Sequence, residues 1–233
     1  LDGKVHSEKT FAALLKVQFT PTLLFFDEKG NVVLRLNGYY PPHKFHVALD
    51  YVAGKHESRV SFTDYLQRNT KEADSGTLHH QPFFLKPPFD FGRSRRPAAK
   101  PLAVVFEQKH CAACDEMHAF GFTDEATLAL LEKFDVARLE LFGKQPVVTP
   151  AGKRLSEETW ARELNVAYTP TIVFFDARGT EVFRIDAYLK PFHFASSFDY
   201  VASGAYRTQP NFQRFIRDRA EKIRSRGGRI DLW

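Results

Sequence analysis

An internal repeat is the feature that most constrains how this chain of 233 residues can fold. Residues 3–39 and 152–188 match in register without a gap, so that Gly3 corresponds to Gly152 and Tyr39 to Tyr188. Both copies contain Thr-Pro-Thr followed by Phe-Phe-Asp, and the match resumes at 49–53 and 198–202. A repeat of this length predicts two related structural units.

Each copy predicts a helix, a turn, a β-hairpin and a second helix. In the later copy Ser156 is suited to cap a helix that ends before Thr169-Pro170. The apolar run 172–175 and the alternating run 181–185 predict two strands joined by a turn, and 191–201 predicts a further helix.

Additional elements are expected before the later copy. Residues 102–106 and 136–141 read as strands, 111–120 as a helix, and Thr123 as the cap of a helix over 124–134. Strands that alternate with helices indicate an α/β layer fold.

The earlier copy has no such preceding segment, because Leu1 aligns with Pro150. A lone hairpin would leave a sheet edge uncovered, so we expect either roughly 90–100 further residues upstream or a second chain to complete it. The expected organisation is half a domain in 1–70, a linker rich in Pro, Phe and Arg in 71–97, and a complete domain in 98–233. We expect the arginines of the linker to face water and its phenylalanines to pack on one domain.

Composition excludes several classes of protein. Ordinary apolar (43%) and charged (26%) fractions exclude a disordered chain, and no apolar run is long enough to span a bilayer. The net charge of +5 is densest near the C-terminus, without the interleaved aromatics or reading motif that nucleic-acid binding would require. Two cysteines cannot form the disulfide framework of a small secreted domain.

The two cysteines form a CxxC motif, Cys111-Ala-Ala-Cys114, between a predicted buried strand and a predicted helix. The helix N-terminus stabilises a thiolate at Cys111, and one helical turn lets Cys114 close a disulfide with it. This arrangement indicates dithiol–disulfide exchange, with Cys111 attacking and Cys114 resolving. Lys109 and His110 are candidates for tuning the thiolate, and Glu107 is a candidate for proton transfer to Cys114.

The same residues are compatible with other kinds of site. Cys111, Cys114, His118 and His110 offer metal ligands, but structural zinc usually needs a second ligand pair elsewhere, so no metal site is predicted. Covalent haem is excluded because Asp115 stands where histidine is required. His118 reads as a partly buried helix residue rather than a proton shuttle. A non-enzymatic alternative is a tandem adaptor or chaperone that binds a partner between its domains, although an adaptor does not need a CxxC motif.

The order of strand, CxxC, helix, strand, helix, Thr-Pro, hairpin and helix resembles the thioredoxin superfamily. The resemblance implies an α/β tandem thioredoxin-like fold, with a mixed central sheet flanked by helices and an incomplete first copy. Phe106-Glu107-Gln108 with the CxxC motif and His118 is similar to periplasmic thioredoxin-like reductases and isomerases, including those of bacterial sulfur-oxidation clusters. The resemblance implies that Pro170 is a cis-proline facing the cysteines and that Thr169 pairs with substrate. Thr20 and Pro21 are the equivalents in the first copy.

The resemblance also implies a thiol–disulfide oxidoreductase, with reductase favoured over isomerase or oxidase. Its expected partners are a protein with a disulfide and an electron donor of membrane or thioredoxin type, in the periplasm or another exported location, with no cofactor. Two departures from cytosolic thioredoxin point to a dedicated partner. Val105 replaces the buried aspartate below the cysteines, and an insertion spans 143–154.

Overall fold

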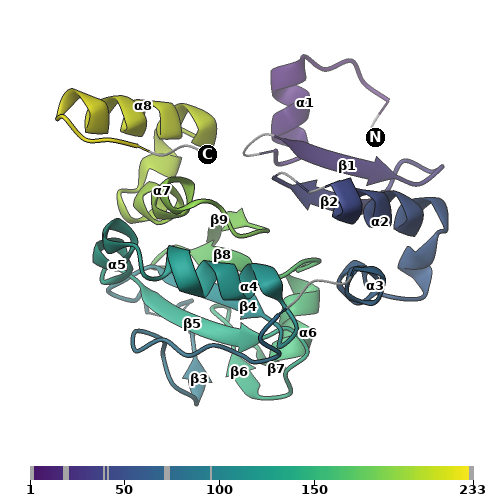
Figure 1. Cartoon of the computed structure of the whole chain (residues 1–233), viewed down its shortest axis with the longest axis horizontal. Helices are drawn as coiled ribbons and strands as arrows, with labels where there is room; N and C mark the ends of the chain where they lie inside the picture. Colours follow the sequence, from purple (N-terminus) through teal and green to yellow (C-terminus); the bar gives the residue numbers. More distant parts are fainter. Residues whose placement is uncertain are drawn as a thin grey trace.

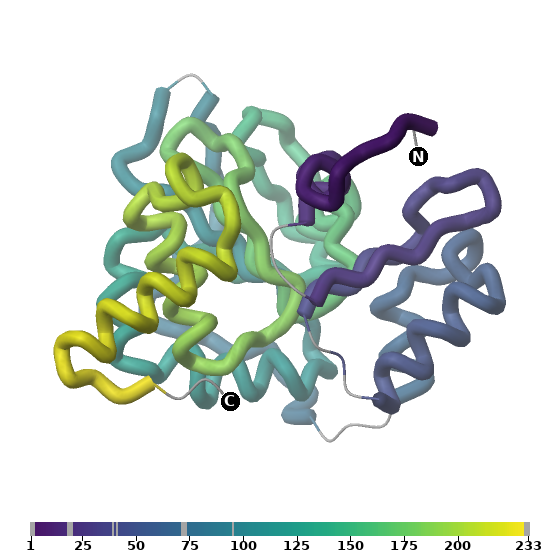
Figure 2. The backbone as a smooth tube through the Cα atoms, turned by 90° about the horizontal axis from the view of Figure 1, so that it is seen from above, coloured from purple at the N-terminus to yellow at the C-terminus, as the bar shows by residue number. Residues whose placement is uncertain are grey.

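Two units of unequal size lie side by side, as the two views at right angles show (Figure 1, Figure 2). The computed structural model describes residues 3–17, 21–38, 40, 42–70, 74–94 and 96–230. The first unit, purple to blue in Figure 1, runs from α1 (Glu8–Leu14) to α3 (Phe62–Asn69). The larger second unit, teal to yellow, holds the elements that follow.

The first unit consists of a β-hairpin and helices. Strands β1 (Thr22–Phe26) and β2 (Val32–Asn37) pair antiparallel, and α2 (Pro42–Ala53) and α3 pack against them. Its core is formed by residues from β2 and both helices, among them Leu34, Leu36, Tyr51 and Leu66. Within the described part of the chain, β1 is hydrogen-bonded to β2 alone.

The two repeat copies form the same elements at corresponding positions. Helix α1 matches α6 (Glu157–Glu163), β1 matches β8 (Thr171–Phe175), and α2 matches α7 (Pro191–Ala202). Ser7 and Ser156 cap α1 and α6 in the same way, each accepting a hydrogen bond from the backbone N–H three residues later. The expected cap at Ser156 is therefore confirmed.

A mixed four-stranded sheet forms the centre of the second unit. Its order is β5 (Asp135–Glu140), β4 (Leu102–Glu107), β8 and β9 (Glu181–Ile185). Strand β4 is parallel to β5 and antiparallel to β8, which is antiparallel to β9. Helices cover both faces, so the expected α/β class with a mixed sheet is confirmed.

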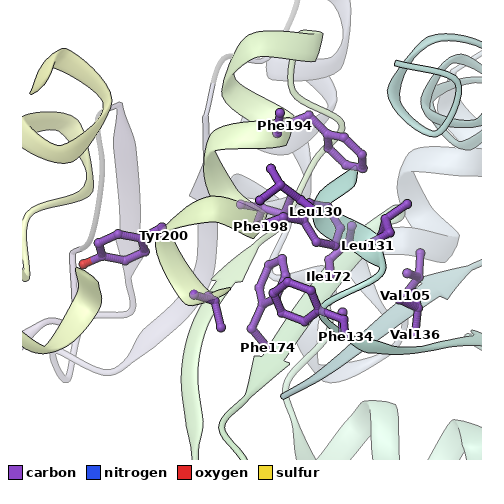
Figure 3. Packing of buried hydrophobic residues seen from close by; sticks show 14 of the residues in the cluster. Val105, Leu130, Leu131, Phe134, Val136, Ile172, Phe174, Phe194, Phe198 and Tyr200 are labelled. Carbon is purple, nitrogen blue, oxygen red and sulfur yellow. The ribbon is translucent and has the colours of Figure 1, made fainter. Parts of the chain in front are cut away.

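Alternate side chains of the buried strands fill two separate cores, as the two-residue period of a strand requires. Val105 and Phe174 point to one face, where α5 (Glu125–Leu131), α7 and α8 (Phe212–Ser225) pack in the aromatic cluster of Figure 3. Phe106 and Phe175 point to the other face, against Trp160 of α6.

The segment expected to be a linker contributes to both of these cores. Phe84 joins the α7 face, while Phe89 and Phe91 join the α6 face. Strand β3 (Phe89–Asp90) pairs in parallel with β6 (Pro146–Val148), which pairs with β7 (Arg154–Ser156) in the insertion. The expectation that these rings pack on one domain is confirmed.

Two local expectations were wrong. Arg93 is buried rather than in water, because its guanidinium donates to the Asp135 carboxylate at 2.6 Å. Asp124, not Thr123, caps α5 by accepting a hydrogen bond from the N–H of Thr127, while the Thr123 hydroxyl bonds back to Ala119.

The helix that follows the CxxC motif changes its winding along its length. Helix α4 (Ala112–Glu116) continues into a π-helical turn, η2 (Met117–Gly121). None of the described helices is long and apolar enough to cross a membrane.

We predict that Phe91→Ala lowers the free energy of unfolding by about 3–5 kcal/mol, because it removes a fully buried ring from the core. Phe91 is 2% exposed and its ring centroid lies 5.7 Å from that of Trp160. The measurement is urea unfolding followed by tryptophan fluorescence. Phe120→Ala is the control, because this ring is 59% exposed. Equal effects of the two variants would show that the segment around Phe91 is not part of the domain core.

Candidate functional site

The CxxC motif follows β4 and lies at the start of α4. Cys111 is the N-cap residue of α4, and its Sγ accepts a hydrogen bond from the N–H of Cys114 at 3.1 Å. The two cysteines form a disulfide with a Cα–Cα distance of 5.2 Å. Cys111 retains 7% of its surface and Cys114 retains 1%. Cys111 is therefore the more accessible of the two sulfur positions.

Pairing of β4 with β8 brings the Thr-Pro motif to the same end of the sheet. Phe106 of β4 is opposite Thr171 of β8, so Thr169 and Pro170 lie beside the segment that leads to Cys111. The Thr169–Pro170 peptide bond is cis. Thr169 is buried, and it lines a pocket together with Cys111.

Glu107, at the end of β4, and His118, four residues after Cys114, form a buried polar pair. His118 Nε2 lies 2.7 Å from Glu107 Oε1, and both residues are at most 4% exposed. His118 Nδ1 lies 3.0 Å from the side-chain amide of Gln81, whereas Glu107 Oε2 has no hydrogen-bond partner within the described part of the chain. The sequence singled out Glu107 and expected His118 to be buried. It did not show that the two pair, because they are separated by a loop and a helical turn.

The other two tuning candidates are exposed. His110 is turned toward the preceding segment, with its Nδ1 3.0 Å from Asp74 Oδ1. Lys109 is exposed and does not line the pocket at Cys111. The structure thus places His110, but not Lys109, in the wall of this pocket.

Segment 74–79 is fastened to α4 through Asp115, a residue whose role the sequence did not reveal. The Asp115 carboxylate accepts from the N–H and the hydroxyl of Ser75, both at 2.7 Å, and lies 2.5 Å from His79 Nε2. Burial acts to raise the pKa of Asp115, but the hydrogen bonds from His79 and Ser75 outweigh it and lower the pKa below its ordinary value.

A pocket of about 90 Å³ lies beside Cys111 at the junction of the two units. Cys111, Ala112 and Ala113 line it from the CxxC motif, and Tyr168 and Thr169 line it from the loop before β8. The first unit contributes Lys44 of α2 and residues of α3, including Thr63 and Gln67.

The first-copy equivalents of the Thr-Pro motif are only partly described. Pro21 is exposed and its carbonyl accepts from the N–H of Gly38, whereas Thr20 lies outside the described residues. Both cysteines of the chain belong to the second unit. Among the side chains that the structure describes, no group of three or more His, Cys, Asp or Glu residues is placed to hold a metal ion.

A family model described as a thioredoxin-like domain matches residues 2–53 and 94–202. The chain belongs to this thioredoxin-like family. The two matched stretches fall in the two units, consistent with a tandem thioredoxin-like fold. A search of curated proteins found no match.

Solved thioredoxin-fold structures are similar to this thioredoxin-like chain. A thioredoxin-fold protein from Helicobacter pylori is 17% identical with a TM-score of 0.49, the match covering 57% of this chain and 89% of that protein. A thioredoxin from Thermus thermophilus is 28% identical with a TM-score of 0.35, covering 44% and 73%. The reduced DsbD C-terminal domain from Neisseria meningitidis is 14% identical with a TM-score of 0.34, covering 45% and 83%.

We predict that His118→Ala lowers the free energy of unfolding by about 3–5 kcal/mol at pH 7, because it leaves the buried Glu107 carboxylate without its partner. The double variant Glu107→Gln/His118→Ala should be more stable than His118→Ala alone, because the stranded charge is gone. Urea unfolding of the two variants measures this difference. A double variant that is less stable than His118→Ala would contradict the buried pair.

We predict that segment 74–79 stays fastened to α4 at neutral pH and loosens only in acid. A carboxylate with a lowered folded pKa stabilises the folded state above its unfolded pKa, and this contribution is lost as pH falls through the folded value. For Asp115 the loosening therefore occurs below the ordinary value of 3.8. Amide hydrogen exchange of Ser75 measures it, and Asp115→Asn should expose Ser75 at pH 7. Loosening of the unmodified chain between pH 7 and 5 would contradict this assignment.

Proposed function

We propose that this chain catalyses thiol–disulfide exchange through Cys111 and Cys114 and acts as a reductase of disulfides in polypeptide substrates. The observation that carries the proposal is the position of the CxxC cysteines at the start of α4, where Cys111 lines a pocket together with Thr169. A disulfide that only stabilised the fold would not need one of its cysteines to line a pocket beside the loop that precedes β8.

Cys111 is the proposed nucleophile of the reduced enzyme. Its sulfur accepts a hydrogen bond from the N–H of Cys114 at the beginning of α4. This environment stabilises a thiolate. The thiolate attacks one sulfur of the substrate disulfide. A Cys111–substrate bond forms, the substrate disulfide breaks, and the released thiolate takes up a proton.

Cys114 is the proposed resolving thiol. It loses its proton and attacks the Cys111 sulfur, which forms the Cys111–Cys114 disulfide and releases the second substrate thiolate, which is then protonated. Two electrons pass from the enzyme dithiol to the substrate. A dithiol donor, proposed to be of membrane or thioredoxin type, returns the enzyme to its reduced form.

Glu107 and His118 are proposed to handle the proton that leaves Cys114. This proposal is supported by the position of His118, which follows Cys114 by about one helical turn and hydrogen-bonds to Glu107. For the other groups we propose that Thr169 and Pro170 shape the substrate site and that His110 borders it. We also propose an exported location, in line with the residues that resemble periplasmic proteins of this family.

Single-turnover exchange tests the proposed function. The chain is reduced with dithiothreitol, freed of reductant and mixed with a short synthetic peptide that contains one disulfide. Loss of enzyme thiols is followed by alkylation and mass spectrometry. We expect the unmodified chain to become oxidised while the peptide is reduced, and Cys111→Ser to remain at background.

Cys114→Ser provides a complementary readout. It should accumulate a mixed disulfide between Cys111 and the peptide, because the resolving thiol is missing. Dithiothreitol should reduce this mixed disulfide and release the peptide. Failure of the unmodified chain to oxidise faster than Cys111→Ser would overturn the proposed function and favour an adaptor role.

A further inference from the structure

The loop that precedes β8 is covered by the first unit. The Thr63 hydroxyl of α3 donates to the carbonyl of Ala167 at 2.6 Å, and Lys44 Nζ donates to the hydroxyl of Tyr168 at 3.2 Å. The ring centroids of Tyr40 and Tyr168 are 5.2 Å apart. Tyr168 thereby packs against the core of the first unit, although it belongs to the second.

A second contact joins the units at the end of the hairpins. The side-chain amide of Asn37, at the end of β2, donates to the carboxylate of Asp186 just after β9. Asn37 is buried, and its own carbonyl oxygen accepts from the hydroxyl of Thr22. The first unit is thus held at both β9 and the loop before β8, beside the position where Thr169 meets the pocket.

The pocket left between the units is narrow. Its volume of about 90 Å³ is smaller than the roughly 150 Å³ cavity that admits benzene. Helix α3 forms one wall and the CxxC motif forms another. While the first unit is docked, α3 and the CxxC motif bound this small space, so the surface of a folded protein is too large to enter it, whereas a small group can reach Cys111.

The pocket also contains an unpaired acceptor. Gln108 is 8% exposed and lines the pocket, and its buried Oε1 has no hydrogen-bond partner among the residues that the structure describes. Its Nε2 donates to the carbonyl of His110 at 3.0 Å, which fixes the orientation of the amide. An unpaired buried acceptor costs free energy that a bound donor recovers. A main-chain N–H of an extended peptide is such a donor.

We propose that the first unit selects substrates by the width of the group that carries the disulfide, which we call width selection. A disulfide in a short or extended peptide reaches Cys111 while the first unit is docked, with a peptide N–H on Gln108 Oε1. A disulfide on the surface of a folded protein reaches Cys111 only after α3 has left the loop before β8. This inference rests on the proposed function for its substrate, but the width selection itself concerns access to Cys111.

Alkylation by reagents of different size tests the width selection independently of activity. The reduced chain is treated with iodoacetamide or with a maleimide carried on a large polymer, and modification of Cys111 is followed by mass spectrometry in a Cys114→Ser background. We expect Tyr40→Ala to raise the rate with the bulky maleimide about tenfold, the factor that corresponds to about 1.4 kcal/mol of lost docking. The iodoacetamide rate should change less than about twofold, well under that factor.

Tyr65→Ala is the matched control. Tyr65 is a partly buried tyrosine of the same unit that packs on Tyr51 and His56, away from the loop before β8. Tyr65→Ala should leave both alkylation rates of Cys111 unchanged. Asn37→Ala is a second opening variant with a smaller change in volume. Hydrogen exchange of 164–171 establishes that docking is lost in Tyr40→Ala and Asn37→Ala, but kept in Tyr65→Ala, while β4 and β5 remain protected in all three.

The outcomes separate the two proposals. Unchanged bulky-reagent rates in Tyr40→Ala and Asn37→Ala, with exchange showing that docking is lost, would overturn the width selection. Rapid modification of the unmodified chain by the bulky maleimide would also overturn it. If alkylation shows the selection but no peptide disulfide is reduced, the proposed function fails and the width selection stands.

With the peptide substrate, Gln108→Leu should raise KM several-fold, because it removes the acceptor for the peptide N–H. An unchanged KM would remove Gln108 from the substrate site.

Discussion

Antiparallel pairing of β4 with β8 is the interaction on which the site depends. These two strands come from distant parts of the sequence, yet their register places Phe106 opposite Thr171. The CxxC motif follows β4 and the Thr-Pro motif precedes β8, so the same pairing that fills both cores also brings the motifs together. A slip of one residue would exchange the faces of the strand and bury the wrong side chains, which makes this register costly to change.

The site combines Cys111, the more accessible of the two cysteines, with a buried pair of polar side chains. Cys111 lines a pocket, whereas Glu107 Oε1 and His118 Nε2 pair in the interior at 2.7 Å. A buried charge without a partner would be strongly destabilising, so the pair must be kept intact as a unit. The docked first unit is a third component of the site. Its helix α3 lines the pocket, although both cysteines belong to the second unit.

The sequence predicted what depends on local pattern and on the repeat. The four strands of the central sheet, the cap at Ser156 and the CxxC motif between β4 and α4 follow from period and capping, and the mixed order of the sheet was expected from the family resemblance. The short strands β3, β6 and β7 were not predicted. Contacts between distant segments did not follow. Asp115 with Ser75, Glu107 with His118, and Thr63 with Ala167 each join side chains that no periodicity relates. Arg93 was misplaced for the same reason, since its partner Asp135 lies in another strand.

The reduction potential of the Cys111–Cys114 pair tests the central claim most directly. The chain is equilibrated in glutathione buffers of graded potential, and its thiols are trapped by alkylation at each point. The account predicts one two-electron transition between about −200 and −270 mV, the range of glutaredoxins and thioredoxin. A pair that stays oxidised in buffers below about −300 mV would behave as a structural disulfide and would contradict the account.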